Sequence, residues 1–386
     1  MSTSGRTNGG DEHPTASDVA VSLREADFVR VLARADGDCL AAAGLLARAL
    51  TECGVPYQVR VGRFGETLAD DPAADDTTVG VGLDPSADAH LPADETPASV
   101  TAFDAARDLG ASPDPTLALA GVAAGGYPVG GGESAHLLES ARDEGVERRP
   151  GVGIPTADLA DGLAHSTLAH AGYSGDTGAV QAALAELGLP AELDDEAHRR
   201  VASEFALAVT GADAATDRSA EAVERALRPH TTPDAPFATV EGYADVLEAV
   251  ARERPGTGVA VALGHDARAD ALDAWRDHAE RVHAVLRNGT TGRYDGLFAL
   301  RTDDAPAETV ARLLRDFRSP EPVALVVSEE SAGAAAVEAS GVGTAMETAA
   351  RAVGGTGGGT ATRGYAEFDP ETDTKEFLSA FREARA

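Results

Sequence analysis

The clearest pattern of apolar and polar positions lies between residues 26 and 61. Residues 28–32 form an apolar run typical of a buried strand, and the segment that follows carries the aspartate and glycine of a turn. Apolar residues then recur at helical spacing, with Asp38 placed to cap the helix and Gly54 placed to end it. A second strand is expected over residues 57–61. This order predicts a βαβ unit, and therefore a parallel sheet.

The same analysis predicts helices and strands along the rest of the chain, with a clear α/β alternation in the last hundred residues. Helices are expected at 99–109, 157–171, 177–187, 195–210, 218–228, 240–254, 268–286, 308–317 and 344–353, and further strands at 77–84, 296–301 and 323–328. The pattern predicts an α/β protein of two domains. The first has a parallel sheet flanked by helices, and the second is a smaller α/β domain.

The chain has 386 residues, which is long for one ordinary hydrophobic core. We expect a disordered tail over residues 1–18, which are rich in Gly, Ser, Thr and Asp and lack periodicity. The first domain is expected over residues 19–230. A proline-rich joint and a connecting helix follow over 231–288, and the second domain over 289–386.

Acidic residues outnumber basic residues by 64 to 32, which gives a formal net charge of −32. This balance is typical of halophilic proteins from a salt-loaded cytoplasm. A strongly acidic surface normally argues against a nucleic-acid partner, because it repels phosphates. At molar salt the Debye length is about 3 Å, so this repulsion is screened. Composition therefore does not exclude a nucleic-acid partner.

The sequence carries no feature of a secreted or membrane protein. It has no run of about 18 apolar residues, and its N-terminus lacks a charged and then apolar signal pattern. Cys39 and Cys53 lie at the two ends of one expected helix, too far apart for a disulfide, and are expected to be small buried thiols. These features predict a cytoplasmic protein with no membrane partner.

Asp36 and Asp38 lie two residues apart on the turn that follows the first strand. Open α/β sheets bind ligands where the carboxyl ends of strands meet the N-termini of helices. Two carboxylates at this place can face one divalent cation, which prefers oxygen ligands. The alternative is structural, with Asp36 capping the turn and Asp38 capping the helix. The spacing alone leaves both interpretations open.

At this turn, residues 34–39 (Arg-Ala-Asp-Gly-Asp-Cys) resemble the first motif of the DHH phosphoesterases, His-x-Asp-x-Asp-Gly, in particular that of the archaeal RecJ-like exonucleases. The two aspartates match the motif. Arg34 stands at the histidine position and Cys39 at the glycine position. A guanidinium cannot replace an imidazole as a metal ligand, because it stays protonated.

The later metal-binding motifs of the family are also altered. The expected strand at 77–84 occupies the frame of the family's Asp-His-His signature, but Asp84 is followed by proline and serine. Asp88 and His90 are the nearby replacements. Residues 116–122 resemble the family's next helix, yet no carboxylate follows at the place where the family has another metal-binding aspartate.

Two further stretches carry the resemblance. Residues 153–176 are similar to a segment of archaeal RecJ-like proteins, and residues 354–364 resemble the glycine-rich loop of the DHHA1 domain, with a threonine in place of its histidine. Glycines let a backbone approach a phosphate and donate several N–H groups to it, whereas the alternative is a flexible glycine hairpin. The expected phosphate or nucleic-acid contacts are Gly357, Gly358, Gly359, Thr360, Arg363 and Arg34.

The resemblance implies a DHH-like domain followed by a DHHA1-like domain, and it supports two hypotheses of function. In the first, the chain is a catalytically degenerate RecJ-like protein with vestigial Asp36, Asp38 and Asp84. It would be a binding or scaffold subunit in DNA replication or repair, like the family's inactive relative in the eukaryotic replicative helicase complex. No cofactor is then expected, and the partners would be single-stranded nucleic acid or replication and repair proteins.

In the second hypothesis, the chain is a metal-dependent exonuclease or phosphodiesterase acting on single-stranded DNA or RNA. Its rebuilt site would bind manganese or magnesium through Asp36, Asp38, Asp84, Asp88 and His90. Two-metal hydrolysis needs a full ligand set that places two cations about 3.5–4 Å apart. The number of ligands present favours the first hypothesis.

Overall fold

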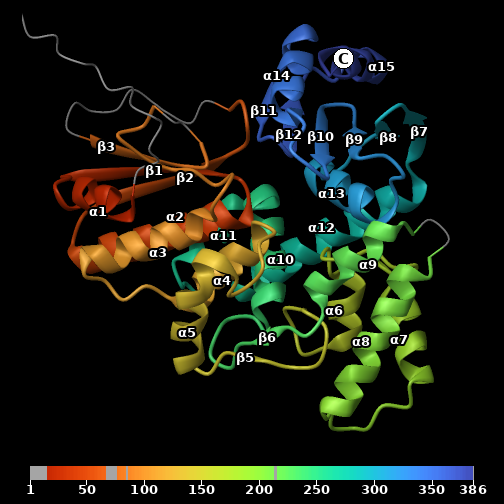
Figure 1. Ribbon diagram of the computed structural model, residues 1–386, viewed down its shortest axis with the longest axis horizontal. Helices are drawn as coiled ribbons and strands as arrows, with labels where there is room; N and C mark the ends of the chain where they lie inside the picture. Colours follow the sequence, from red (N-terminus) through yellow and green to blue (C-terminus); the bar gives the residue numbers. More distant parts are fainter. Residues whose placement is uncertain (1–14, 67–75, 84–85, 213–214, 386) are drawn as a thin grey trace, which may run out of the picture.

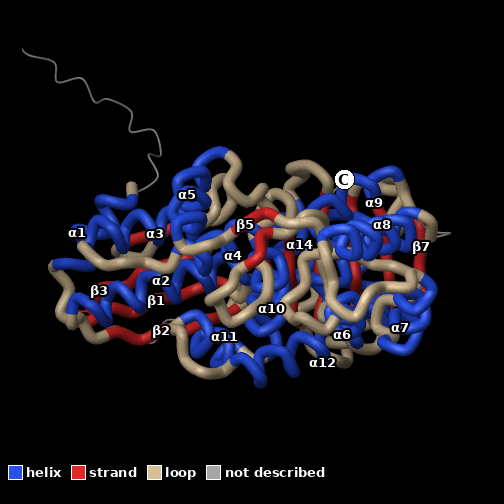
Figure 2. Tube along the Cα trace, turned by 90° about the horizontal axis from the view of Figure 1, so that it is seen from below, coloured by secondary structure: helices blue, strands red, loops and turns tan. Residues whose placement is uncertain are grey.

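The computed structural model describes residues 15–66, 76–83, 86–212 and 215–385. In Figure 1 the strands of the N-terminal part lie at the left and those of the C-terminal part at the upper right, with most of the helices beneath them. Figure 2 shows the same elements from below, with α2, α4 and α10 following one another from the N-terminal sheet toward the middle of the molecule.

The N-terminal sheet has four parallel strands in the order β2-β1-β3-β4. These are β1 (Phe28–Arg34), β2 (Tyr57–Gly62), β3 (Asp76–Val81) and β4 (Ala89–Leu91). Because β1 is central, Val29, Val31 and Ala33 are fully buried. The predicted βαβ unit is confirmed, since α2 (Gly37–Cys53) connects the parallel strands β1 and β2.

Helices cover this sheet because their apolar residues need a shared core. They are α1 (Ala16–Arg24), α3 (Ala98–Leu109), α4 (Pro115–Ala124), α5 (Ala135–Asp143) and α10 (Val240–Glu253). Helix α4 is apolar around its whole circumference, and it packs against both α2 and α10. Its sequence therefore reflects burial on every side rather than one amphipathic face.

A helical region follows the N-terminal sheet along the chain. It contains α6 (Leu159–His165), α7 (Thr177–Glu186), α8 (Asp195–Thr210), α9 (Asp217–Val223), α11 (Pro255–Ala262) and α12 (Arg268–Asn288). Two short 3-10 turns, η1 (Gly132–Ser134) and η2 (Glu224–Ala226), and one antiparallel strand pair, β5 (Glu147–Arg148) with β6 (His230–Thr231), complete it. Helices α7 and α8 extend to the lower right in Figure 1.

The C-terminal sheet has six strands in the order β11-β12-β10-β9-β8-β7. They are β7 (Thr290–Tyr294), β8 (Leu297–Arg301), β9 (Val323–Val327), β10 (Ser331–Ala336), β11 (Thr356–Gly359) and β12 (Arg363–Glu367). Strands β8 and β9 are parallel and the other neighbours are antiparallel.

Helices cover both faces of this sheet. Val323, Leu325 and Val327 belong to the core formed with α14 (Val342–Ala352) and α15 (Thr374–Ala384), while the alternate residues of β9 belong to the core formed with α13 (Ala307–Phe317). Side chains of a strand point alternately to its two faces, so a strand buried on both faces must be apolar throughout. The α/β fold class with two sheets is confirmed.

The long helix α12 contributes to two cores. Trp275 belongs to the core of the N-terminal sheet, whereas Val282 and Leu286 belong to the core that includes α13. The indole of Trp275 donates a 2.8 Å hydrogen bond to Asp245 on α10, so the buried aspartate has a partner. The two parts of the molecule are therefore joined by continuous packing. The boundaries expected at 19–230, 231–288 and 289–386 remain a prediction.

The structure corrects several local expectations. The helix expected at 157–171 ends at His165, and Thr15 caps a helix that includes residues 16–18 of the expected tail. The rest of that tail, residues 1–14, lies outside the described part of the chain. Cys39 is buried as expected, but Cys53 is exposed. No helix in the described ranges is long and apolar enough to cross a membrane.

The buried His283 and the half-buried His170, from distant parts of the chain, lie in contact. The ring of His170 stacks on that of His283 with centroids 5.2 Å apart, and their Nδ1 atoms are 3.1 Å apart. His283 Nε2 is 3.1 Å from the Ser166 carbonyl and therefore donates to it. Neutral His283 then accepts at Nδ1 from His170. Burial, followed by the charges of Arg318 and Arg287, lowers the pKa of His170 to about 4.

We predict that the protein loses stability as the pH falls from 7 to 5. In the unfolded chain His170 has its ordinary pKa of about 6.5, whereas in the folded chain its pKa is about 4. The folded pKa is depressed, so acid favours the unfolded state, by about 2 kcal/mol at pH 5 from this group alone. Urea unfolding at both pH values in molar potassium chloride measures this change in the free energy of unfolding. In His170→Asn, whose amide still donates, the pH dependence should be smaller, and an unchanged dependence would contradict the assignment.

Candidate functional site

The site is built on the turn at the carboxyl end of β1. Asp36 has an extended backbone, and one of its carboxylate oxygens accepts a 2.9 Å hydrogen bond from the Cys39 N–H. Asp36 is therefore the N-cap of α2, which begins at Gly37. The expectation that Asp38 caps this helix is wrong, because Asp38 lies within its first turn.

Arg34 occupies the crevice beside this turn and is only 3% exposed. Its Nε donates to the second carboxylate oxygen of Asp36, and its Nη1 lies 3.3 Å from the Gly82 carbonyl and 3.4 Å from Asp94. The ring of Phe64 covers the guanidinium at 5.0 Å. The Nη2 atom is buried and has no hydrogen-bond partner among the described residues.

This ion pair keeps Asp36 charged. Burial by itself would raise the pKa of Asp36, but the positive charges of Arg34 and Arg363 outweigh it and hold the pKa below its usual range. Each carboxylate oxygen of Asp36 already accepts from a protein donor, one from Arg34 and one from Cys39. Both oxygens are thus engaged, and the guanidinium beside them repels a metal cation.

Asp38 caps a different helix from the one it belongs to. Its two oxygens accept hydrogen bonds of 2.8 Å and 3.0 Å from the N–H groups of Ala98 and Ser99, the first residues of α3. Pro97 precedes them and provides no side-chain cap. Burial, followed by the charge of Asp36, raises the pKa of Asp38 to about 6. Asp38 therefore has a structural role in joining α2 to α3.

The other expected metal ligands do not gather at this turn. Asp84 lies outside the described residues. Asp88 accepts a 2.8 Å hydrogen bond from the Thr78 N–H. Thr78 is paired with Arg30 in the sheet, and Arg30 lies four strand residues, or about 13 Å, from Arg34. His90 lies on β4, two strands away from β1, or about 10 Å. Within the described ranges, no group of three His, Cys, Asp or Glu residues could hold a metal ion. The residues present do not fit the two-metal centre of the family.

The glycine-rich segment forms a hairpin rather than an open loop. Strand β11 pairs with β12, and the Thr360 side chain accepts from the N–H groups of Thr362 and Arg363 in the turn. A Cβ atom at Gly359 would lie 2.1 Å from the Arg363 carbonyl oxygen, and one at Gly357 would lie 2.8 Å from the Tyr365 carbonyl oxygen. These glycines are required by backbone packing, so the segment is a packed hairpin, and contact of its residues with phosphate stays a prediction.

A loop of the N-terminal part covers one face of this hairpin. Gly65 has a φ of 81°, and a Cβ there would lie 2.7 Å from the Gly357 nitrogen. Phe64 is the nearest neighbour of Gly358, at 3.6 Å from a Cβ built there. Gly357 and Gly358 therefore contact protein. Of the expected phosphate contacts, Arg34 pairs with Asp36, and Arg363 lies near enough to lower the pKa of that carboxyl.

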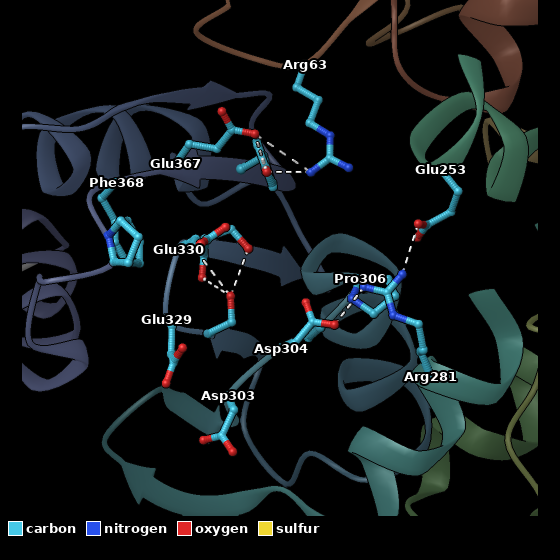
Figure 3. A pocket seen from close by; sticks show the side chains of 15 residues that line it. Arg63, Glu253, Arg281, Asp303, Asp304, Pro306, Glu329, Glu330, Glu367 and Phe368 are labelled. Atoms are coloured by element: carbon cyan, nitrogen blue, oxygen red, sulfur yellow. Dashed lines mark hydrogen bonds and ion pairs between the residues drawn. The ribbon is translucent and has the colours of Figure 1, made fainter. Parts of the chain in front are cut away.

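Arg63 fastens this loop to the C-terminal sheet, as Figure 3 shows. Its Nη1 donates to the hydroxyl of Tyr365, its Nη2 lies 3.2 Å from the Arg252 carbonyl, and its guanidinium lies 4.7 Å from the Tyr365 ring. Nothing in the sequence marks Arg63 or Phe64, because their partners lie far away along the chain.

Beyond Arg63, Figure 3 shows an open cavity of about 750 Å³. Its carboxylates include Glu253, Asp303, Asp304, Glu329, Glu330 and Glu367. Arg281 bridges Glu253 and Asp304, with 2.9 Å contacts to each. The remaining negative charge disfavours a phosphate in this cavity. A phosphate would therefore find its cations on the Arg34 and Arg363 side of the hairpin.

The chain is similar to known proteins in sequence and in fold. The chain is 49% identical over 375 residues to the uncharacterized protein rrnAC1427 of Haloarcula marismortui, covering 95% of this chain and 96% of that protein. Residues 289–383 match a family model described as the C-terminal domain of rrnAC1427.

Solved structures with similar folds include CDC45 from Entamoeba histolytica, with a TM-score of 0.58 and 9% identity over 95% of this chain and 97% of that one. An exonuclease RecJ bound to manganese has a TM-score of 0.49 and 13% identity over 97% of this chain and 94% of that one. At 9% identity the likeness to CDC45 shows a shared fold and nothing of activity.

We predict that Arg34→Met lowers the free energy of unfolding by about 3 kcal/mol or more, because it leaves the Asp36 carboxylate buried without its cation. The matched control is Arg351→Met, since the Arg351 side chain is 72% exposed and pairs with Glu347 on the surface of α14. The control should change stability by about 0.5 kcal/mol or less. Denaturant unfolding in molar potassium chloride compares them, and equal stabilities would contradict a structural role for the buried pair.

We predict that Gly359→Ala lowers the free energy of unfolding by about 2 kcal/mol or more, since its Cβ would meet backbone that cannot move away. Gly358→Ala should have little effect, because its nearest neighbour lies at an ordinary contact distance of 3.6 Å. Thermal unfolding of the two variants makes the comparison. If both were tolerated equally, the segment would not be the packed hairpin described above.

Proposed function

The chain belongs to the family of the Haloarcula marismortui protein rrnAC1427, and we propose that it is a non-catalytic RecJ-like protein that acts as a binding or scaffold subunit in DNA replication or repair. The fold shared with CDC45 and the resemblance of the sequence to RecJ-like proteins support this placement. The subunit would work in the salt-loaded cytoplasm that its composition indicates.

One observation carries the proposal of lost catalysis. All four carboxylate oxygens of Asp36 and Asp38 accept from protein donors, and a buried guanidinium lies where the family motif has a histidine. Two-metal hydrolysis needs carboxylates that are open to cations. Binding a metal here would require breaking a buried ion pair and uncapping α3, each of which is costly.

The remaining binding surface lies at the hairpin turn. Arg363 has no carboxylate within 4 Å in the described part of the chain, and its charge is close enough to Asp36 to lower the pKa of that carboxyl. The hydroxyl of Tyr127 lies 3.1 Å from the Asp94 carbonyl, next to the same crevice. A phosphate of a single strand could therefore contact Arg363. Such binding would be insensitive to base sequence, since it reads the backbone.

The second candidate function is hydrolysis by a rebuilt site that includes Asp84, Asp88 or His90. A catalytic role of Asp84 can be tested, because Asp84 comes shortly after β3 in the sequence and β3 ends at the crevice. To reach Asp36, however, Asp88 would have to move by about the length of a strand, and His90 by two strand spacings. The geometry therefore favours the non-catalytic proposal.

We predict that the protein leaves a labelled single strand of DNA intact in molar potassium chloride with millimolar manganese, and that calorimetry detects no tight binding of manganese. The reason is that no carboxylate pair is open to the metal. The control is the Asp36→Asn variant. If the native protein did degrade the strand and used this turn to do so, Asp36→Asn should lose that degradation. Degradation by the native protein that Asp36→Asn abolishes would establish the enzyme instead.

We predict that the same strand binds the native protein weakly and that Arg363→Gln weakens it about tenfold, as expected for one charge-assisted contact with phosphate. Arg351→Gln, a change on an exposed helix face, should bind as the native protein does. Fluorescence anisotropy at several salt concentrations measures both. If Arg363→Gln and Arg351→Gln bound the strand equally well, the hairpin turn would not be part of the binding surface. Failure to retain replication proteins from extracts of the source cells would contradict the scaffold role.

A further inference from the structure

A separate cavity of about 330 Å³ lies where α4, α10, η2 and α13 meet. Much of its wall is apolar and includes Leu168, Leu227 and Ala244. It contains neither Arg34 nor Asp36, so it is distinct from the crevice. Its volume is within the range of small-molecule sites, which combine apolar walls with a few placed polar groups.

Arg312 is the unusual residue of this cavity. Its Nη2 lies 2.9 Å from the Thr167 carbonyl, and it has no carboxylate within 4 Å in the described ranges. The neighbouring arginines differ from it. Arg225 and Arg315 both pair with Asp316, at 2.5 Å and 2.6 Å. A guanidinium has five N–H donors, and the bond to Thr167 uses one of those of Arg312. The residue lines this cavity and the small one beside Arg363, so a ligand in either could accept from the others.

The fold disfavours the charge that it holds there. Burial, and then the nearby charge of Arg225, lowers the pKa of Arg312 to about 10, well below the usual value for arginine. Arginine still remains protonated near neutral pH, so the cavity holds a half-buried cation with no carboxylate in direct contact with it among the described residues. Such a charge is costly, and an oxyanion seated against it would remove the cost.

The carboxylates that line the cavity offset the charge of Arg312 only in part, because those inside it are hydrogen-bonded to other partners. Glu241 accepts from the backbone and ring of His230, at 2.9 Å and 2.8 Å. Asp245 accepts from Thr167 and Trp275. Glu248 pairs with Arg252. Glu221 and Glu224 are exposed at the rim.

We propose that this cavity binds a small organic oxyanion, a phosphate monoester or a carboxylate, with its charged end on Arg312 and a flat apolar body against Leu168, Leu227 and Ala244. This site goes beyond the scaffold role and does not depend on it. Recognition comes from the planar fork of the guanidinium, which matches two oxygens of either group, and from the burial of the apolar body.

Four probes test the two parts of this recognition. Phenyl phosphate and benzoate carry both an oxyanion and a ring, phenol carries the ring alone, and inorganic phosphate carries the charge alone. The first two should bind by calorimetry and raise the melting temperature by on the order of 2 °C at saturating concentrations. Phenol and inorganic phosphate should bind at least tenfold more weakly. Comparison of the first two shows which oxyanion is preferred.

Arg312→Gln separates a ligand-binding role from a structural one. A glutamine amide can still donate to the Thr167 carbonyl, and the variant no longer buries a charge, so without ligand it should melt at the same temperature as the native protein or higher. Its response to phenyl phosphate and benzoate should be lost. Arg312→Lys keeps the charge but loses the fork, and should bind both probes about tenfold more weakly. Arg351→Gln should respond as the native protein does.

Three outcomes would overturn the proposal. The first is that neither phenyl phosphate nor benzoate binds the native protein at millimolar concentration. The second is that they bind Arg312→Gln or Arg312→Lys as tightly as the native protein. The third is that Arg312→Gln melts well below the native protein and Arg312→Lys binds the probes normally, which would make Arg312 a structural residue. Each outcome leaves the scaffold role and the strand-binding tests unaffected.

Discussion

The buried ion pair between Arg34 and Asp36 determines how the N-terminal part is assembled. Taking two charges out of water is costly, and the pair persists only because every neighbour contributes to it. Asp36 also caps α2, the Gly82 carbonyl after β3 accepts from Arg34, and Phe64 after β2 covers the guanidinium. The ends of three strands and the start of one helix thus converge on one charge pair. The same convergence places a cation against Asp36, which disfavours a metal ion there.

Close approach of backbones is the second constraint, and it explains the glycines better than ligand binding does. A Cβ at Gly343 would lie 2.4 Å from the Gly359 carbonyl oxygen, and one at Gly37 would lie 2.6 Å from the Cβ of Ala124. The glycine-rich hairpin is thus held between α14 on one side and the Phe64 loop on the other. Packing alone can therefore account for the glycines of a segment that resembles a phosphate-binding loop.

Much of the fold could be predicted from the sequence, because periodicity reports burial. The apolar run of β1 and the helical spacing of α2 placed the βαβ unit correctly. The strands β10 and β11 could not be found in this way, since alanine and glycine side chains show no alternation of apolar and polar residues. The capping pattern at Thr15 and Asp18 was a local signal for α1 that could have been used.

At the site, sequence reasoning placed the right residues on the right turn but could not assign their roles. Asp38 is fixed by Ala98 and Ser99, which lie 60 and 61 residues away along the chain. Phe64 and Arg63 act only through the packing of the two parts of the molecule. Spacing within a motif carries no information about such partners. It therefore could not distinguish a metal ligand from a helix cap.

The distribution of charge links the crevice to the central cavity. Arg312 and Arg363 both line a small enclosed cavity of about 30 Å³, together with Arg252, Arg315 and two glutamates. With 64 acidic residues in the chain, a lack of carboxylates does not explain why these two arginines have no carboxylate within 4 Å among the described residues. Carboxylates on the surface are screened at high salt, whereas buried charges are screened much less. The charge of Arg312 is therefore offset chiefly by the carboxylates that lie near it in the interior, such as Glu248.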